Sequence, residues 1–328
     1  MRTFRRVMTY ALLAGILSFL IVPLVIPETT SGTLTNVEAA GSGAEFETLA
    51  GVSVHLERQA FAESSANTPP LIVLLHGFGA STFSWRDVIE PLAKFGDVIA
   101  YDRPGFGFTE RPTSWGEVNP YGFEGNFKIL DALISKFGSE RQVVLVGHSA
   151  GGQLAAEYAR QNPMKVSSLI LVDPAILTTG GGMEGFDWLY GIPQIKKLGP
   201  ILVSSIATSG MDLLRESYFD QSQLTPEVLA GYQSPLKVKG WEVGFWNFAT
   251  APRKNDLAKN LGLLRLPTLL ITGSNDTVVP TSDTVKLKTL IANSDLEVIQ
   301  SSAHLPQEEK PTEFMLAISK HWDTLVSK

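Results

Sequence analysis

The chain has 328 residues, of which 44% are hydrophobic, and a formal net charge of -6 at pH 7. This length allows one large α/β domain with an insertion, or two ordinary domains, around a substantial buried core. The acidic balance argues against a nucleic-acid-binding surface, and the absence of cysteine excludes disulfides and thiolate metal sites.

Three arginines, Arg2, Arg5 and Arg6, precede an uncharged run over residues 7–27. As an α-helix this run would be about 31 Å long, which matches the hydrocarbon thickness of a bilayer. The sequence therefore predicts a membrane anchor within residues 1–28. Because positively charged residues stay on the cytoplasmic side, this anchor would place the rest of the chain on the non-cytoplasmic side.

A cleaved signal peptide is the alternative to this anchor. The tripeptide Val37-Glu38-Ala39 fits the small-residue pattern at which signal peptides are cut, and cleavage there would release a secreted protein. Residues 29–45 are rich in Ser, Thr, Gly and Ala, a composition typical of linkers. We therefore expect residues 29–45 to connect the anchor or signal to a folded domain.

Beyond this segment, short apolar runs alternate with segments of helical length, and most of the runs are typical of strands buried on both faces. The expected strands cover residues 52–56, 71–75, 98–101, 143–146, 169–172, 268–272 and 296–299. The expected helices cover residues 83–94, 121–137, 150–161, 282–292 and 312–325. The repeated order of strand and helix predicts an α/β fold with a mostly parallel sheet covered by helices on both faces. Its core would comprise residues 46–173 and 267–328.

One long interval, residues 174–266, contains no convincing strand. We expect it to form a largely helical cap, inserted between two strands and placed over the carboxyl edge of the sheet. Seven aromatic residues of the interval could line a cleft or simply pack the cap onto the sheet. They are Phe186, Trp188, Tyr190, Trp241, Phe245, Trp246 and Phe248.

A candidate nucleophile follows the expected strand at residues 143–146. Residues 147–151, GHSAG, fit the pattern G-x-S-x-G between a strand and a helix, which is the context that this motif requires. Glycines leave room for a tight turn that lifts the hydroxyl of Ser149 to the top of the sheet. The start of a helix also favours negative charge at this point. A structural turn rich in glycine is the competing interpretation until partners for the serine are found.

A serine hydroxyl needs a base, and the best-placed histidine is His304, between the last strand and the last helix. It is therefore expected at the same sheet edge as Ser149. The other four histidines lie in an early strand (His55), after the strand at residues 71–75 (His76), beside the serine (His148) and in the last helix (His321). We expect His148 to pack against the site, because the turn aims the side chains of neighbouring residues apart.

A carboxylate usually holds such a histidine in the correct tautomer, and Asp276 follows the strand at residues 268–272. The chain order Ser149, Asp276, His304 is that of the α/β-hydrolase arrangement. Asp173, after the strand at residues 169–172, is the alternative acid, although the rigid Pro174 follows it.

Backbone N–H groups should stabilise the oxyanion that forms when the serine attacks. The expected donors are the N–H of Ala150, directly after the nucleophile, and that of Phe78 in the loop HGFG. This loop lacks the third glycine of a dinucleotide-binding motif, and no Walker lysine follows GHSAGG. Histidines and carboxylates do not cluster at metal-ligand spacing, so we expect no cofactor and no metal.

With these residues in place, the chain resembles the α/β-hydrolase superfamily from about Phe46 to its C-terminus. The resemblance is carried together by HGFG, DRPGFG from Asp102, GHSAGG, GSNDTVVP and AHLPQEEKP. It implies an eight-stranded, mostly parallel sheet with a helical cap, a triad of Ser149, Asp276 and His304, and a structural role for Asp102. The chain looks most like cap-bearing esterases, ring-cleavage-product hydrolases and epoxide hydrolases. Epoxide hydrolases have an aspartate where this chain has the serine, which argues against epoxide or haloalkane chemistry.

The expected activity is hydrolysis of a small carboxylic ester with an apolar part, through an acyl-enzyme. The nearest rival is cleavage of a carbon-carbon bond in a ring-cleavage-type diketone, which needs a cation for a second carboxylate. Arg215, Lys237 and Arg253 in the cap are candidates for that cation. A non-enzymatic receptor that retains the triad is the alternative from another class. The expected partners are the substrate and a membrane bound through the N-terminal helix, with no nucleic acid.

Overall fold

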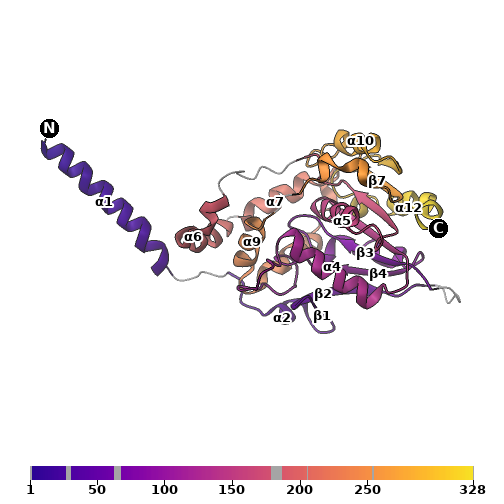
Figure 1. The fold of residues 1–328 in the computed structure, drawn as a ribbon, viewed down its shortest axis with the longest axis horizontal. Coiled ribbons are helices and arrows are strands. Elements are labelled where there is room, and N and C mark those ends of the chain that lie inside the picture. The colour runs from indigo at the N-terminus through magenta and orange to yellow at the C-terminus, as the bar shows by residue number, and fades with distance from the viewer. Residues whose placement is uncertain are drawn as a thin grey trace.

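A single eight-stranded sheet forms the centre of the molecule in the computed structural model, which describes residues 2–26, 31–62, 68–178, 187–204, 206–252 and 255–327 (Figure 1). The strands are β1 Glu45–Leu49, β2 Val52–Gln59, β3 Leu71–Leu75, β4 Asp97–Tyr101, β5 Val143–His148, β6 Ser168–Val172, β7 Thr268–Gly273 and β8 Ser294–Ile299. Their order in the sheet is β1-β2-β4-β3-β5-β6-β7-β8. Strands β1 and β2 pair antiparallel, as do β2 and β4, and all other pairs are parallel. The predicted mostly parallel, eight-stranded sheet is confirmed.

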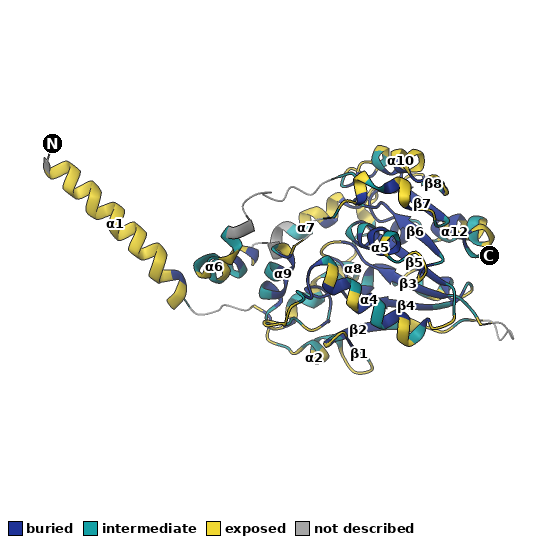
Figure 2. Cartoon of the chain, viewed as in Figure 1, coloured by how far each residue is buried: buried dark blue, intermediate teal, exposed yellow. Residues whose placement is uncertain are grey.

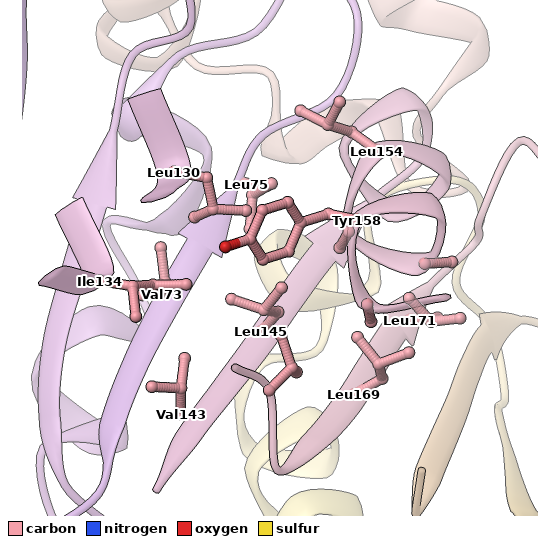
Figure 3. Packing of buried hydrophobic residues seen from close by; sticks show 14 of the residues in the cluster. Val73, Leu75, Leu130, Ile134, Val143, Leu145, Leu154, Tyr158, Leu169 and Leu171 are labelled. Carbon is pink, nitrogen blue, oxygen red and sulfur yellow. The ribbon is translucent and has the colours of Figure 1, made fainter. Parts of the chain in front are cut away.

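Both faces of the sheet are buried under helices. On one face Val73 and Leu145, which are directly paired across β3 and β5, pack beneath α4 (Phe123–Phe137) and α5 (Ala150–Gln161). Figure 3 shows Tyr158 of α5 lying among leucines of this face. On the opposite face Ile72 and Val144 pack beneath α3 (Ile89–Leu92) and α12 (Pro311–Val326). Successive strand residues point to opposite faces, which is why the central strands are continuously apolar.

Two expectations for the core were wrong in detail. The helix expected at residues 83–94 is instead the 3-10 turn η1 Thr82–Trp85 followed by the short helix α3. Pro91 lacks the N–H that a continuous helix would donate to the residue four positions earlier. Strand β1 was not expected, because it is an edge strand with charged residues at both Glu45 and Glu47 and little buried surface. The remaining helices of the core are α10 Thr281–Leu290 and α11 Pro306–Glu309.

The described residues between β6 and β7 contain helices and no strand, as expected of the cap. They form α6 Pro193–Val203, α7 Ile206–Glu216, α8 Pro226–Gln233 and α9 Trp241–Ala249, with the 3-10 turns η2 Asp187–Gly191, η3 Gln221–Gln223, η4 Ser234–Lys237, η5 Leu257–Lys259 and η6 Leu261–Leu263. A separate apolar cluster formed by Phe106 and Tyr121 of the core with Trp241, Phe245 and Phe248 of α9 joins the cap to the core.

The N-terminal region has two parts. Helix α1 (Arg2–Val25) is almost entirely exposed (Figure 2), and an 18-residue stretch within Thr3–Val25 has a mean hydropathy of 2.2. By length and composition it is able to cross a membrane, a property that a signal sequence shares. The linker expected over residues 29–45 differs from the structure where that segment is described: it contains α2 (Asn36–Ala40), it contacts the cap, and β1 begins at its end.

Candidate active site

Ser149 lies at a sharp turn between β5 and α5. Its backbone has φ 52° and ψ -119°, a left-handed conformation that is uncommon for a residue with a side chain. The N–H of Ser149 donates to the carbonyl of Val172 at the end of β6, at 2.9 Å. Strained backbone of this kind persists only where the surroundings hold it, and it is concentrated at functional sites.

The flanking glycines are required by close approach of the backbone. A Cβ added to Gly151 would lie 2.2 Å from the carbonyl oxygen of Leu75 in β3. A Cβ added to Gly147 would lie 2.6 Å from the carbonyl oxygen of Gly151. The G-x-S-x-G pattern therefore reflects a helix that starts in direct contact with the neighbouring strand, which holds Ser149 at the carboxyl edge of the sheet.

Asp276 and His304 meet at the same edge. Nδ1 of His304 lies 2.7 Å from Oδ2 of Asp276, and both side chains are buried. The other oxygen of Asp276 accepts the N–H groups of Val278 and Val279, at 2.8 and 3.1 Å. These backbone hydrogen bonds hold the carboxylate in place, and its contact with Nδ1 directs Nε2 of His304 away from Asp276. His304 and Ser149 line the same pocket.

The alternative acid, Asp173, lies beside this pair rather than in its place. Its Oδ1 accepts the hydroxyl of Thr272 at 2.6 Å and the N–H of Gly273 at 3.2 Å. Burial, followed by the negative charge of Asp276, raises the pKa of Asp173 well above its usual value. Asp173 therefore holds its proton more tightly than an exposed aspartate does.

Asp173, Asp276 and His304 also have the composition of a metal site, since one possible ligand atom of each lies within 4.8 Å of the others. However, protein N–H and O–H donors already occupy three of the four carboxylate oxygens, including the Asp276 oxygen that faces His304. The arrangement suits a hydrogen-bonded acid and histidine better than a cation.

The expected oxyanion donors lie at suitable places in the fold. Ala150 is the first residue of α5, so its N–H belongs to the first turn, where backbone donors have no partner within the helix. Phe78 lies in the loop after β3 and lines the pocket with Ser149. Their role as donors remains a prediction.

Two further buried histidines, His148 and His76, contact the candidate base His304 and the loop after β3. Nε2–H of His148 donates to the carbonyl of His304 at 2.7 Å, and the two rings are 4.7 Å apart. Burial and the charge of His304 lower the pKa of His148 well below its usual value, so it stays neutral. The sequence predicted only that His148 packs here, and its hydrogen bond to the base was missed.

His76 holds the other side of the site. Its Nδ1–H donates to the carbonyl of Gly77 at 2.8 Å, and its Nε2 accepts the N–H of Arg103 at 3.0 Å. Burial, with the charge of Arg103, lowers the pKa of His76 to about 3. It is thus a neutral histidine that fixes the loop before Phe78. Similarly, Asp102 accepts from buried His55 at 2.9 Å, consistent with a structural role.

The pocket over Ser149 has mostly apolar walls from both core and cap. Of the seven aromatic candidates in the cap, Trp241 and Phe245 line it. Trp246 packs instead against Tyr190, with ring centroids 5.8 Å apart, and Phe248 packs against Phe106. The aromatic residues of the core that line the pocket, Phe78 and Phe106, were not anticipated. Phe186 and the side chain of Trp188 lie outside the described residues.

A cation that was not among the candidates, Arg111 of the core, lines the pocket. Arg111, in the loop after β4, lines the pocket and donates to the carbonyls of Gly107 and Thr109, at 2.7 and 3.0 Å. Burial lowers its pKa to about 10, so it is still charged at pH 7. Among the cap candidates, Arg215 pairs with exposed Asp212, Lys237 is not part of the pocket wall, and Arg253 lies outside the described residues.

A buried carboxylate, Glu308, fastens the cap to the loop that carries His304. Its Oε2 accepts Arg86 of the core at 2.5 Å and the hydroxyl of Tyr218 at 2.6 Å, and its Oε1 accepts the hydroxyl of Tyr232. Tyr232 lines the pocket. In addition, the N–H of His304 donates to the carbonyl of Ser217 at 3.0 Å. The cap and the candidate base are therefore directly connected, which the sequence did not indicate.

Comparison with known proteins agrees with this architecture. The sequence profile of the family described as alpha/beta hydrolase fold matches residues 70–311. The chain is 27% identical to a monoacylglycerol lipase of Homo sapiens, over 79% of this chain and 77% of that protein. It is 28% identical to a 2-hydroxy-6-oxo-2,4-heptadienoate hydrolase of Pseudomonas putida, over 76% of this chain and 87% of that protein.

Solved structures show the same likeness. A meta-cleavage product hydrolase from Pseudomonas fluorescens, in a mutant complexed with acetates, is 25% identical to this chain and superimposes with a TM-score of 0.64. The match covers 85% of this chain and 97% of that one. Since the family profile spans most of the chain and the fold and sheet order agree, the chain is a hydrolase that belongs to the alpha/beta hydrolase fold family.

Proposed function

We propose that the protein is a serine hydrolase that cleaves a carboxylic ester with an apolar part through an acyl-enzyme. The observation that carries this proposal is the buried contact of His304 with Asp276, 2.7 Å long, at the wall of the pocket that Ser149 also lines. The strained turn at Ser149 supports its assignment as the nucleophile. The likeness to a monoacylglycerol lipase supports an ester as substrate.

The reaction would begin when His304 takes the proton of Ser149 while the serine oxygen attacks the ester carbonyl carbon. The N–H groups of Phe78 and Ala150 would hold the resulting oxyanion. Collapse of this intermediate breaks the bond to the alcohol, which leaves with the proton from His304. A water molecule, deprotonated by His304, then attacks the acyl carbon, and the acid is released. Asp276 would keep the histidine oriented and stabilise its cation.

The pocket favours a substrate with an apolar portion. Side chains of Phe78, Phe106, Trp241 and Phe245 surround the serine with aromatic surface, and burial of an acyl chain against them would contribute binding energy. Helix α1 supports a location at a membrane, with Arg2, Arg5 and Arg6 on the cytoplasmic side and the hydrolase on the other.

A second candidate, hydrolysis of a carbon-carbon bond in a ring-cleavage-type diketone, is favoured by one observation. Arg111 puts a positive charge at the pocket wall, where it could bind the second carboxylate of such a substrate. The likeness to a 2-hydroxy-6-oxo-2,4-heptadienoate hydrolase supports the same possibility. Rates on a 4-nitrophenyl ester and on a ring-cleavage dienoate separate the two activities, and we expect faster turnover of the ester.

The nucleophile can be tested by labelling the detergent-solubilised protein with a fluorophosphonate. We expect the wild type to be labelled and Ser149→Ala and His304→Ala to lose the label. Ser204→Ala, which changes an exposed serine at the end of α6, is the matched control and should label normally. Labelling that persists in Ser149→Ala would refute the assignment of the nucleophile.

A further inference from the structure

The short segment after α1, residues 31–35, runs along the cap instead of hanging free. The N–H groups of Thr33 and Leu34 both donate to the carbonyl of Lys237 at 3.0 Å, and the N–H of Lys239 donates back to Leu34 at 2.8 Å. Leu34 and Val238 form a parallel β-bridge. We call residues 31–35 the strap, because they pair with the cap between η4 and α9.

The strap also supplies the partners of a buried carboxylate. The N–H and the hydroxyl of Ser31 donate to Oε1 of Glu242, at 2.6 and 2.8 Å, and the hydroxyl oxygen accepts Nε1–H of Trp241 at 2.8 Å. Glu242 is only 1% exposed. Within the described part of the chain, the hydrogen bonds to this carboxylate both come from Ser31. Without Ser31, a buried carboxyl group would therefore lose its donors, which is unfavourable.

The fit between strap and cap is close enough to require a glycine. A Cβ added to Gly32 would lie 2.1 Å from the carbonyl oxygen of Val238, well inside van der Waals contact. Gly32 is itself buried, although it lies only a few residues beyond the membrane-length helix. The strap thus makes a specific contact with the cap, in which backbone pairing, hydrogen bonds to a buried carboxyl group and a close backbone approach occur together.

The part of the cap that the strap holds is a wall of the candidate active site. Leu236 lies directly before the paired residues Lys237–Lys239, and Trp241 follows them closely; both Leu236 and Trp241 line the pocket over Ser149. The strap contacts the indole of Trp241 directly and fixes the backbone on its N-terminal side. Displacement of the strap would therefore release one apolar wall of the pocket.

The position of the strap bears on the fate of α1. The tripeptide Val37-Glu38-Ala39 lies in α2, whose first turn is closed by a capping box between Thr35 and Glu38. Cleavage after Ala39 would remove the whole strap and leave Glu242 buried without its donors. The folded hydrolase thus needs residues that a cut at this place would discard.

We propose that the strap is a positioning element of the substrate pocket and that the chain is consequently not cut after Ala39. The effect of the strap on the substrate rests on the proposed ester hydrolysis, whereas the contacts between the strap and the cap do not depend on it. Ser31 is the positioning residue: it acts on the acyl chain through Trp241 and does not touch the reacting atoms.

The positioning role is tested on the full-length protein in detergent, with 4-nitrophenyl laurate and 4-nitrophenyl acetate as substrates. In Ser31→Ala the backbone N–H still binds Glu242, so the fold should persist, but Trp241 loses its acceptor. We expect KM for the laurate to rise about tenfold, whereas kcat for the acetate, which is too short to reach the wall, stays unchanged. Ser31→Thr should restore KM, and Ser42→Ala, an exposed serine beyond α2, should behave as the wild type.

Retention of the strap is tested by the intact mass of the protein purified from both the membrane and the soluble fractions of the cells that make it. We expect a mass that includes the strap in every active form. A fully active soluble product that begins at Ala40 would overturn the proposal, and so would a Ser31→Ala variant with wild-type KM for the laurate. Absence of turnover of either ester by the wild type would instead refute the proposed function, while the mass would still decide whether the strap is retained.

Discussion

Two acidic side chains lie side by side near His304, in different surroundings. Asp276 accepts His304 and two backbone N–H groups. Asp173 is fully buried, and burial together with the charge of Asp276 raises its pKa. Asp276 is therefore placed to orient the histidine, whereas Asp173 is a buried hydrogen-bonding neighbour.

This difference predicts that the same substitution lowers kcat strongly at Asp276 and only slightly at Asp173. Asp276→Asn should lower kcat on a 4-nitrophenyl ester by about 10⁴-fold, because an amide favours the wrong tautomer of His304. Asp173→Asn should change kcat by less than about threefold, since Asp276 is the acid that accepts from His304 and an amide of the same shape can keep the hydrogen bonds from Thr272 and Gly273. Steady-state kinetics at pH 7.5 measure both. A larger loss in Asp173→Asn than in Asp276→Asn would reverse the assignment of the acid.

At the scale of elements, the turn between β5 and α5 depends on how closely α5 approaches β3. A Cβ on residue 151 would lie only 2.2 Å from the carbonyl oxygen of Leu75. Backbone atoms of a central strand cannot move aside without breaking pairs on both sides of it. The position of Ser149, the candidate nucleophile, is therefore a consequence of helix packing as much as of the serine itself.

Gly151→Ala should consequently lower the free energy of unfolding by about 2 kcal/mol or more, the usual range for overpacking. The fluorophosphonate labelling rate should fall with it, because α5 must shift. Gly262→Ala is the matched control, since a Cβ there meets no atom within 4 Å. Urea unfolding of both variants measures the difference. Equal stability of the two would mean that the turn has more freedom than its geometry indicates.

The junction of α11 with the cap is a second element with a specific prediction. Burial raises the pKa of Glu308, against the opposing effects of Arg86, Tyr218 and Tyr232, yet its oxygens are filled by these three donors. Glu308→Gln removes the charge from a buried ion pair and should cost about 3 kcal/mol of stability. Because Tyr232 lines the pocket, KM should rise as well. Thermal unfolding and steady-state kinetics test this.

The control for this variant is Glu313→Gln, which changes an exposed glutamate in the next helix and should be neutral. If Glu308→Gln unfolded at the wild-type temperature with an unchanged KM, the carboxylate would not hold the cap.

At the scale of the whole molecule, stability depends on pH through buried histidines. Burial alone lowers the pKa of His55, but the hydrogen bond and charge of Asp102, with the charges of Glu57 and Glu45, raise it overall above its model-compound value of 6.5. The folded state thus holds this proton more tightly than the unfolded chain. The resulting stability is complete below pH 6.5 and is lost as pH rises through the folded pKa.

We therefore expect the stability difference between the wild type and His55→Asn to be constant from pH 5.5 to 6.5 and to shrink above that range. The contributions of His76, His148, Asp173 and Glu308 are present in both proteins and cancel in this difference. Urea unfolding at a series of pH values up to 8.5 gives the difference directly. A gap that grows with pH would contradict a raised pKa for His55.

The local sequence pattern was sufficient to predict the inner strands of the sheet and to select the candidate catalytic residues. The inner strands β3, β5 and β6 are almost continuously apolar because helices cover both of their faces, so their signal does not depend on register. Ser149, Asp276 and His304 each follow a strand, and parallel strands end at one edge of the sheet. Their meeting could therefore be expected from chain order alone.

Only the tertiary structure decided the contacts between residues that lie far apart in sequence. Glu242 lies 211 positions from Ser31, and Glu308 lies 222 positions from Arg86. No periodicity relates such pairs, and a serine in a Ser- and Gly-rich segment has the composition of a linker. The sequence by itself thus determined the inner sheet and the placement of Ser149, Asp276 and His304 at its edge. The tertiary structure decided which charges are buried, what forms the pocket wall and where the N-terminal segment is held, because burial and partner choice depend on the packing of the whole chain.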